Sequence, residues 1–317
     1  MNIFGVEAEK ETSKIILLPV PWEVTTSYGA GTSLGPKIID KASYQVDLYD
    51  SHFGSFIDQG IFLEQEFGNI SELNAEFKPL ADDPKSVAKI NAASDKVNEA
   101  VYSKTKEILA RGKICGVIGG DHASPFGALR AYAEHFKGDF GVLHFDAHAD
   151  LRDCYQGFNF SHASIMNNVV SKLNPAKLVQ VGIRDFCEEE KLFIETHAKT
   201  VKTFYDDYLK AEQLKGKPWS ALVDEIISEL PKNVYISFDI DGLDPSLCPN
   251  TGTPVPGGLS FSEISFLLNR LLEKKKKIVG FDLCEVSLGE NLGDFEWDAN
   301  VGARILFKLC GLALRTN

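Results

Sequence analysis

Three short segments combine acidic and histidine side chains at spacings that suit metal chemistry. They are Gly119-Gly120-Asp121-His122, Asp146-Ala147-His148-Ala149-Asp150 and Asp239-Ile240-Asp241-Gly242-Leu243-Asp244-Pro245. Each follows an apolar run typical of a buried strand, and α/β sheets bind ligands at the carboxyl ends of such strands. Carboxylate oxygens and imidazole nitrogens suit Mn²⁺, and suit Ni²⁺, Co²⁺ or Zn²⁺ less selectively. The segments therefore predict a two-metal site.

The spacing within these segments suggests how the ligands converge. If Asp146, His148 and Asp150 continue an extended chain, alternation turns all three side chains to one face. Asp239 and Asp241 repeat that arrangement from another strand. Four carboxylates gathered without a cation would be strongly destabilising. Two ions that share carboxylates lower the pKa of a water held between them, so the pattern is typical of a metal hydrolase.

Composition limits the fold and the partners. The chain has 317 residues, of which 44% are hydrophobic, enough for one large α/β domain with a substantial core. A net charge of -12 argues against a nucleic-acid partner or an anionic membrane surface, because both require clustered lysine and arginine. Divalent ions and a small cationic substrate are the partners that such a charge attracts.

The cysteines and the N-terminal residues indicate a cellular compartment. The six cysteines are scattered and form no Cys-x-x-Cys pair, so we expect reduced thiols. The N-terminus meets acids at Glu7 and Glu9 and lacks the basic and apolar regions of a signal peptide. No apolar run has transmembrane length. These features predict a cytoplasmic protein.

Strand and helix patterns alternate along the chain. Apolar runs predict strands at 15–20, 114–118, 140–145, 178–181, 201–204, 234–238 and 278–283. Helical spacing is found at 87–109, 125–136, 162–173, 188–197, 219–230, 261–272 and 299–314, and Pro36 suits the first turn of a further helix. Residues 53–84 are acidic and irregular, which suggests an insertion at the surface. The alternation predicts a mainly parallel sheet covered by helices on both faces.

The chain resembles the ureohydrolase family, the arginase and agmatinase group, over most of its length. Besides the metal segments, the family order includes Ser33-Leu34-Gly35-Pro36, Ser161-His162-Ala163-Ser164, Val181-Gly182-Ile183-Arg184 and Asp282-Leu283-Cys284-Glu285-Val286. The resemblance implies that residues 1–317 form a single ureohydrolase domain with an arginase-like three-layer α/β/α fold. It also implies two Mn²⁺ ions per subunit and a homotrimer or homohexamer.

Roles carry over from the family residue by residue. His122, Asp146, Asp150 and Asp239 would hold one ion, and Asp146, His148, Asp239 and Asp241 the other, so that Asp146 and Asp239 bridge. His162 matches the proton-shuttling histidine of the family, and an imidazole suits that role near neutral pH. Glu285 matches the carboxylate that binds the guanidinium, whose planar N–H groups favour such a partner. Asp121 and Asp282 are predicted to orient ligands rather than to bind metal.

The substrate is predicted to be agmatine, hydrolysed to putrescine and urea. Arginases carry an asparagine where Arg152 stands here, so arginine is disfavoured, and the Thr251-Gly252-Thr253-Pro254 loop resembles agmatinase sequences. Arg152 and Thr251 are predicted to contact substrate. If Arg152 faces the pocket, it would repel an ammonium and favour guanidinobutyrate or formiminoglutamate. Asp153 could instead neutralise it in a surface pair.

Other classes of function remain alternatives. Free guanidine is a possible substrate, because related guanidine hydrolases use Ni²⁺. A non-catalytic metal-binding member of the same fold is disfavoured by the presence of every ligand together with His162 and Glu285. A deacetylase of similar fold would have fewer metal ligands in a different arrangement.

Overall fold

Eight parallel strands form one sheet through the centre of the molecule. In this computed structural model, residues 2–288 and 297–317 are described. The strands are β1 (Ile15–Val20), β2 (Ile61–Leu63), β3 (Ile114–Gly119), β4 (Gly141–Phe145), β5 (Lys177–Ile183), β6 (Val201–Tyr205), β7 (Asn233–Asp239) and β8 (Lys277–Cys284). Their spatial order is β2-β1-β3-β8-β7-β4-β5-β6, with every pair parallel. The two strands formed late in the chain, β7 and β8, therefore lie at the centre of the sheet.

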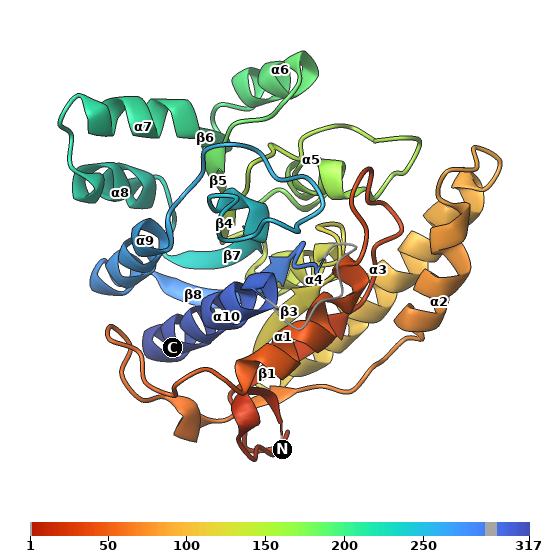
Figure 1. Cartoon of the computed structure of the whole chain (residues 1–317), viewed down its shortest axis with the longest axis horizontal. Helices are drawn as coiled ribbons and strands as arrows, with labels where there is room; N and C mark the ends of the chain where they lie inside the picture. The colour runs from red at the N-terminus through yellow and green to blue at the C-terminus, as the bar shows by residue number, and fades with distance from the viewer. Residues whose placement is uncertain (1, 289–296) are drawn as a thin grey trace.

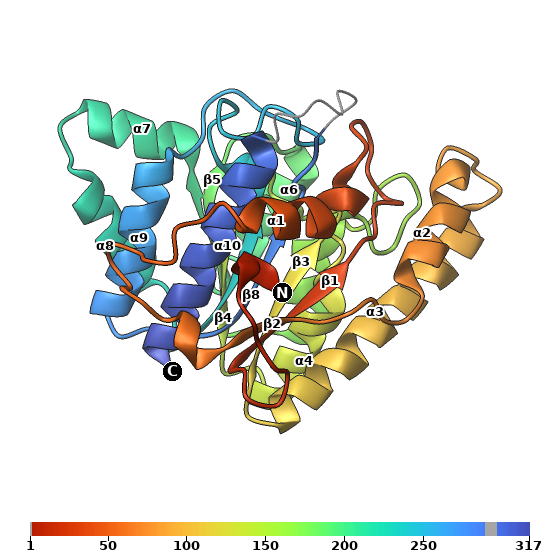
Figure 2. The ribbon, with the colours of Figure 1, turned by 60° about the horizontal axis from the view of Figure 1, so that its bottom comes forward.

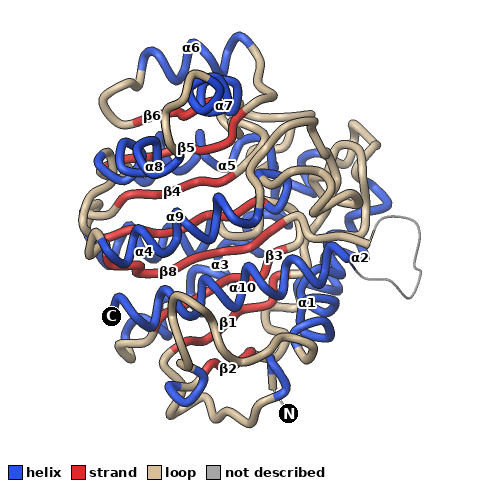
Figure 3. Tube along the Cα trace, turned by 60° about the vertical axis from the view of Figure 1, so that its left-hand side comes forward, coloured by secondary structure: helices blue, strands red, loops and turns tan. Residues whose placement is uncertain are grey.

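Helices cover both faces of this sheet (Figures 1 and 3). They are α1 (Gly35–Ser43), α2 (Ile70–Phe77), α3 (Val87–Ala110), α4 (Phe126–Phe136), α5 (Ile165–Asn168), α6 (Glu188–Thr196), α7 (Asp206–Leu214), α8 (Trp219–Ser228), α9 (Phe261–Glu273) and α10 (Trp297–Thr316). Helices α1, α10, α9 and α8 pack side by side on one face, and α3, α4 and α5 cover the other. The architecture is the predicted three-layer α/β/α arrangement.

The alternation of side chains along the strands supplies two separate cores. In β1, Ile15 and Leu17 belong to the same core as residues of α1, α9 and α10, whereas Ile16 and Leu18 belong to the core that includes residues of α3 and α4. All four side chains are fully buried. Because both faces are covered, the strands read as continuous apolar runs rather than as an apolar and polar alternation. This is why the strands were recognisable from the sequence.

The predicted strands and helices are confirmed in place and type, with three corrections. Residues 53–84 are not a surface insertion: they contain β2 and α2, and Phe53 and Phe56 are buried against α10. Helix α7 was missed because it follows β6 directly and its sequence is largely polar. The predicted helix 162–173 consists of three short turns of 3-10, α and π type. Among the described residues, no helix combines the length and apolar character needed to cross a bilayer.

Candidate metal centre

The predicted metal ligands and Glu285 meet at the carboxyl ends of four strands. His122 follows β3 and Asp146 follows β4, while Asp239 is the last residue of β7 and Glu285 follows β8. The sheet order places β8 and β7 between β3 and β4, so these four ends are adjacent. The loops that contain residues 22–34 and 243–258 lie at the same end of the molecule, where the Gly29 N–H donates to the Gly252 carbonyl at 3.3 Å (Figure 2). The site therefore lies where an open α/β sheet ordinarily binds ligands.

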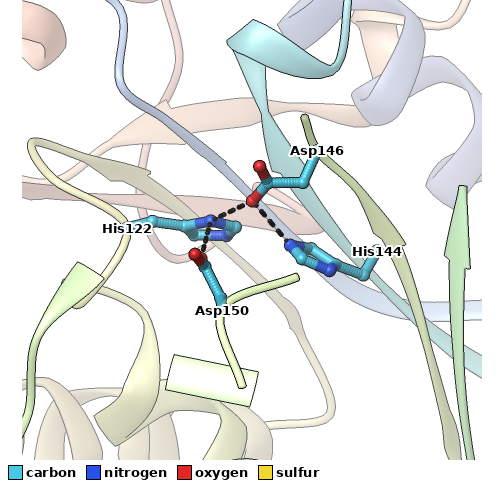
Figure 4. Close-up of side chains that lie close together, drawn as sticks. All are labelled: His122, His144, Asp146 and Asp150. Atoms are coloured by element: carbon cyan, nitrogen blue, oxygen red, sulfur yellow. Dashed lines mark hydrogen bonds and ion pairs between the residues drawn. The ribbon is translucent and has the colours of Figure 1, made fainter. Parts of the chain in front are cut away.

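One group of ligands surrounds the Nδ1 atom of His122. This nitrogen lies 3.1 Å from Asp146 Oδ2, 3.3 Å from Asp150 Oδ2 and 3.3 Å from Asp239 Oδ2. Figure 4 shows the His122 ring between Asp146 and Asp150. These four side chains are the set that the family resemblance assigned to one ion, and all are buried. The structure thus brings the first predicted ligand set together.

A second group surrounds His148. Its Nδ1 atom lies 3.1 Å from Asp241 Oδ2 and 3.4 Å from Asp146 Oδ1. Asp146 therefore presents one oxygen to each group, which is the arrangement required of a bridging ligand. Asp239 directs Oδ2 toward His122, whereas its Oδ1 accepts the Asp241 N–H at 2.8 Å. A bridging role for Asp239 stays a prediction.

The ligands do not converge by strand alternation, and that part of the prediction is wrong. Strand β4 ends at Phe145, and Asp150 has a positive φ of 55°. The chain therefore turns between His148 and Asp150, so that Asp150 faces His122 while His148 faces Asp241. A non-glycine residue in the left-handed region is strained and persists only where its surroundings hold it. The loop geometry separates the donors into two groups, which a straight strand could not do.

The charge of the cluster fits divalent cations. Four buried carboxylates face two imidazoles, so when all four are ionised the groups together are negative even with both rings protonated. Burial lowers the pKa of His122, but Asp146, Asp150 and Asp239 outweigh that effect and raise it well above its usual value. Burial raises the pKa of Asp150 to about 8, and the negative charge of Asp146 adds to this shift. Oxygen and imidazole donors with unbalanced negative charge suit Mn²⁺ and similar ions.

Two further acids, Asp121 and Asp282, accept hydrogen bonds from Thr25 and Ser237, which in turn lie next to His162 and His122. Asp121 Oδ2 accepts from the N–H and the hydroxyl of Thr25, at 3.0 and 2.7 Å, and burial raises the pKa of Asp121 to about 6. The Thr25 hydroxyl in turn accepts the His162 N–H at 3.0 Å. Asp282 Oδ1 accepts from the Ser237 hydroxyl, which lies 2.9 Å from His122 Nε2. These contacts agree with the orienting roles predicted for Asp121 and Asp282.

Glu285 lies beside the His122 group in a constrained conformation. Its φ is 62°, and its N–H donates to the Gly120 carbonyl at 2.8 Å. Its carboxylate accepts the His122 N–H at 2.9 Å, and burial raises the pKa of Glu285 well above its usual value. Thr251 is buried and donates its hydroxyl to the Glu285 carbonyl at 2.9 Å. Thr251 thus holds the backbone of Glu285, and its predicted contact with substrate stays a prediction.

A cavity of about 170 Å³ opens next to the His148 group. It is lined by Ser27, His148, Asp150, Arg152, Tyr155, His162, Ala163, Asp185, Phe186, Glu190 and Thr253. The His162 Nε2 atom lies 3.3 Å from the Ser27 hydroxyl. Burial and the positive charge of His148 lower the pKa of His162 to about 4. The ring of His162 is therefore neutral at pH 7.

Arg152 lies in the wall of this cavity. Its Nε atom is 3.9 Å from Glu190 Oε2, and its guanidinium carbon is 5.0 Å from the centre of the Tyr155 ring. The partner expected from the sequence, Asp153, is exposed, and the ion pair is made with Glu190 instead. Glu190 is buried and also accepts the Leu151 N–H at 2.9 Å. The geometry therefore fixes Arg152 at the pocket with its charge partly balanced.

Sequence reasoning missed His144. This residue lies inside β4, is fully buried, and directs Nε2 to Asp146 Oδ2 at 2.8 Å (Figure 4). The available signal was a histidine two residues before Asp146, which strand alternation puts on the same face. Ser27 and Glu190 were also missed, and no local pattern distinguishes them from ordinary loop and helix residues.

Comparisons with known proteins find relatives over most of the chain. A family model described as "Arginase family" matches residues 13–310. The chain is 31% identical to N(1)-aminopropylagmatine ureohydrolase of Synechocystis sp. over 96% of this chain and 92% of that protein. It is 30% identical to the agmatinase of Pyrococcus horikoshii over 95% of this chain and 92% of that protein. The crystal structure of agmatine ureohydrolase of Thermoplasma volcanium superposes with a TM-score of 0.76 and 26% identity, covering 99% of this chain and 94% of that one.

Proposed function

Because this chain belongs to the arginase family, we propose that it hydrolyses the guanidinium group of a small cationic amine to urea and the free amine. Agmatine, which yields putrescine and urea, is the substrate we propose first. The observation that carries this proposal is the carboxylate of Asp146, which directs one oxygen to the His122 group and the other to the His148 group. Two ions that share such a ligand are a recurring device for hydrolysis.

The metal centre would be held by the six predicted ligands. They are His122, Asp146, His148, Asp150, Asp239 and Asp241. A bound metal pair supplies an acidified water for attack on the guanidinium carbon. We propose Mn²⁺ as the native ion, with Ni²⁺ or Co²⁺ as alternatives, because the donors are oxygen and imidazole nitrogen.

The protein's own residues would bind the guanidinium and transfer the proton. The Glu285 carboxylate lies against the His122 backbone and can accept planar guanidinium N–H groups. His162 lines the cavity, where its neutral ring can take up a proton and give it to the departing amine. The Ser27 hydroxyl, 3.3 Å from His162 Nε2, orients that ring.

The charge of the cavity wall favours a cationic tail over a carboxylate. Asp185 and Glu190 contribute negative charge to the lining, and Arg152 contributes positive charge. Glu190 pairs with Arg152, so Asp185, whose side chain is 67% exposed and lies 4.0 Å from His148 Nε2, is the acid that we expect to attract an ammonium group. A guanidino acid such as guanidinobutyrate is the second candidate, since a carboxylate could displace Glu190 from Arg152.

A substrate panel tests the proposal. Urea release is measured from protein loaded with Mn²⁺, and separately with Ni²⁺, on agmatine, N(1)-aminopropylagmatine, arginine, guanidinobutyrate and free guanidine. Formiminoglutamate is assayed by release of formamide. We expect the cationic amines to be hydrolysed fastest. A preference for guanidinobutyrate would favour the second candidate, and the Arg152→Gln variant should then lose that preference.

A pair of aspartate variants tests the metal centre. We expect Asp146→Ala to lose bound metal and urea release together, because both groups of ligands lose an oxygen. Asp153→Ala is the matched control, because Asp153 is exposed and lies in the loop that follows Asp150. This variant should bind metal and release urea as the unmodified protein does. Unchanged turnover by metal-free Asp146→Ala would exclude the two-metal reaction. The predicted cytoplasmic location and homotrimeric or homohexameric state are tested by cell fractionation and light scattering.

A further inference from the structure

A row of polar side chains crosses the middle of the sheet beneath the metal centre. The strand register aligns Thr203 of β6, Gln180 of β5, His144 of β4, Ser237 of β7 and Asp282 of β8. Gln180, His144, Ser237 and Asp282 are each fully buried. A parallel sheet covered on both faces ordinarily carries apolar residues at such positions, because buried polar groups are costly unless they are hydrogen-bonded. Five neighbouring exceptions in one row therefore call for a specific explanation.

The hydrogen bonds of Gln180 fix the orientation of its amide. Its Nε2 atom lies 2.7 Å from the Ala149 carbonyl oxygen. A carbonyl can only accept, so the atom that faces it must be the donating NH₂ group. The amide oxygen then faces Thr203, whose hydroxyl donates to it at 2.8 Å. Thr203 and Ala149 together prevent the amide from turning over.

The fixed amide determines which nitrogen of His144 carries the proton. Gln180 Nε2 is also 3.1 Å from His144 Nδ1, and its second N–H points to that atom as a donor. His144 Nδ1 must then accept, so the proton of the neutral ring is on Nε2. His144 Nε2 lies 2.8 Å from Asp146 Oδ2 and donates to it. Asp146 Oδ2 is the same oxygen that faces His122 Nδ1.

From this geometry we propose that Thr203, Gln180 and His144 form a positioning relay for the bridging carboxylate of Asp146. The relay holds Asp146 Oδ2 in place through His144 Nε2, from within the sheet. The His148 N–H holds Oδ1 from the other side, at 2.6 Å. The relay also anchors the Ala149 carbonyl, which lies between the predicted ligands His148 and Asp150. This inference rests on the proposed function, because its consequence is the strength of metal binding.

Variants of Gln180 and Thr203, the two members that do not contact Asp146, test the relay. Gln180→Leu removes all three side-chain hydrogen bonds of Gln180, and we expect Mn²⁺ affinity, measured by calorimetric titration, to fall by about 10-fold to 100-fold. Thr203→Val removes only the bond that orients the amide, so we expect a fall of about 2-fold to 10-fold. Thr203 lies in β6, the edge strand, and is not fully buried, so this variant is the one best suited to fold normally. Thr203→Ser keeps the hydroxyl and should retain full affinity.

A second measurement separates the relay from a general packing effect. Nitrogen-15 NMR of the histidine rings, recorded without metal, should find the His144 proton on Nε2 in the unmodified protein. Gln180→Leu should shift that proton distribution. Thr105→Val is the matched control, because Thr105 is a buried threonine that contacts Cys115 Sγ at 3.6 Å, away from the site. It should leave both the Mn²⁺ affinity and the His144 ring unchanged.

The outcomes distinguish the relay from the proposed function. The relay is overturned if Gln180→Leu and Thr203→Val bind Mn²⁺ as tightly as the unmodified protein, or if the proton of His144 lies on Nδ1. Urea release by the unmodified protein would leave the proposed function standing in that case. If the unmodified protein neither binds Mn²⁺ nor releases urea, the proposed function fails, whereas the position of the His144 proton can still be measured.

Discussion

Replacing Arg184 with lysine should loosen one half of the metal centre. The guanidinium of Arg184 donates to the carbonyls of Gly182, Asp241, Leu243 and Val255 at 2.7 to 3.2 Å, in five contacts. It thereby joins the 3-10 turn that carries Asp241 to the loop around Val255. No single lysine nitrogen can reach all four carbonyls, because the contacts come from three nitrogens of a planar group.

The size of the effect follows from the contacts that are lost. A lysine ammonium has three N–H donors at one atom, so at least two of the five contacts disappear. A hydrogen bond to a charged group contributes about 1.5 kcal/mol at the low end of its range, which suits a side chain that is partly exposed. The Arg184→Lys variant should therefore be about 3 kcal/mol less stable. For a chain of 317 residues this corresponds to a fall in Tm of about 5 °C.

Thermal unfolding and metal titration check the prediction. Because Asp241 faces His148 rather than His122, we expect the second Mn²⁺ equivalent to bind more weakly while the first binds normally. Arg270→Lys is the matched control. Arg270 pairs with Asp224 and Glu273 on the surface, and such pairs contribute less than about 1 kcal/mol. An unchanged Tm and two full-affinity sites in Arg184→Lys would refute the reasoning.

Two further predictions concern the core and the cavity. Lys308→Met leaves the buried carboxylate of Asp50 without its cation and should cost about 3 kcal/mol at pH 7, measured by denaturant unfolding. Burial raises the pKa of Asp50, but hydrogen bonds from Lys308, His52 and Phe53 outweigh it and lower the pKa. Because the pKa of Asp50 is lowered in the folded protein, the ionised carboxylate contributes stability above its unfolded-state pKa of about 3.9. This contribution is lost as the pH falls below about 4 toward the folded-state pKa, so the difference in free energy of unfolding between the two proteins should shrink there. A constant difference would contradict this. His162→Asn should retain bound Mn²⁺ but release urea at least about 100-fold more slowly, and full activity would remove His162 from the reaction.

The sequence identified most of the elements because the signal for each is local. Strands buried on both faces, such as residues 114–119 and 234–238, read as apolar runs, and a helix such as α9 is marked by the capping box of Ser260 and Glu263. The same local view failed for α7 and for residues 53–84. Helix α7 is largely polar, and residues 53–84 mix acidic residues with short apolar runs that pack against other elements.

The candidate ligands were also identifiable from the sequence, whereas their grouping was not. Residue type and spacing singled out His122, Asp146 and Asp239, since few other patterns place acids and histidines after buried strands. The turn at Asp150, which separates the two groups, depends on a positive φ that spacing does not reveal. The partner of Arg152 was likewise decided by folding, which brings Glu190 of α6 to the cavity.

What the sequence alone determined is thus the fold class and the order of the elements, and it singled out the residues predicted to bind metal. Only the tertiary structure decided that β7 and β8 lie between β3 and β4, and that Gln180, His144, Ser237 and Asp282 share one row. The physical reason is the range of the interactions. Hydrophobic periodicity and capping act within a few residues, whereas the pairing of parallel strands joins residues far apart in the chain through backbone hydrogen bonds and a shared core.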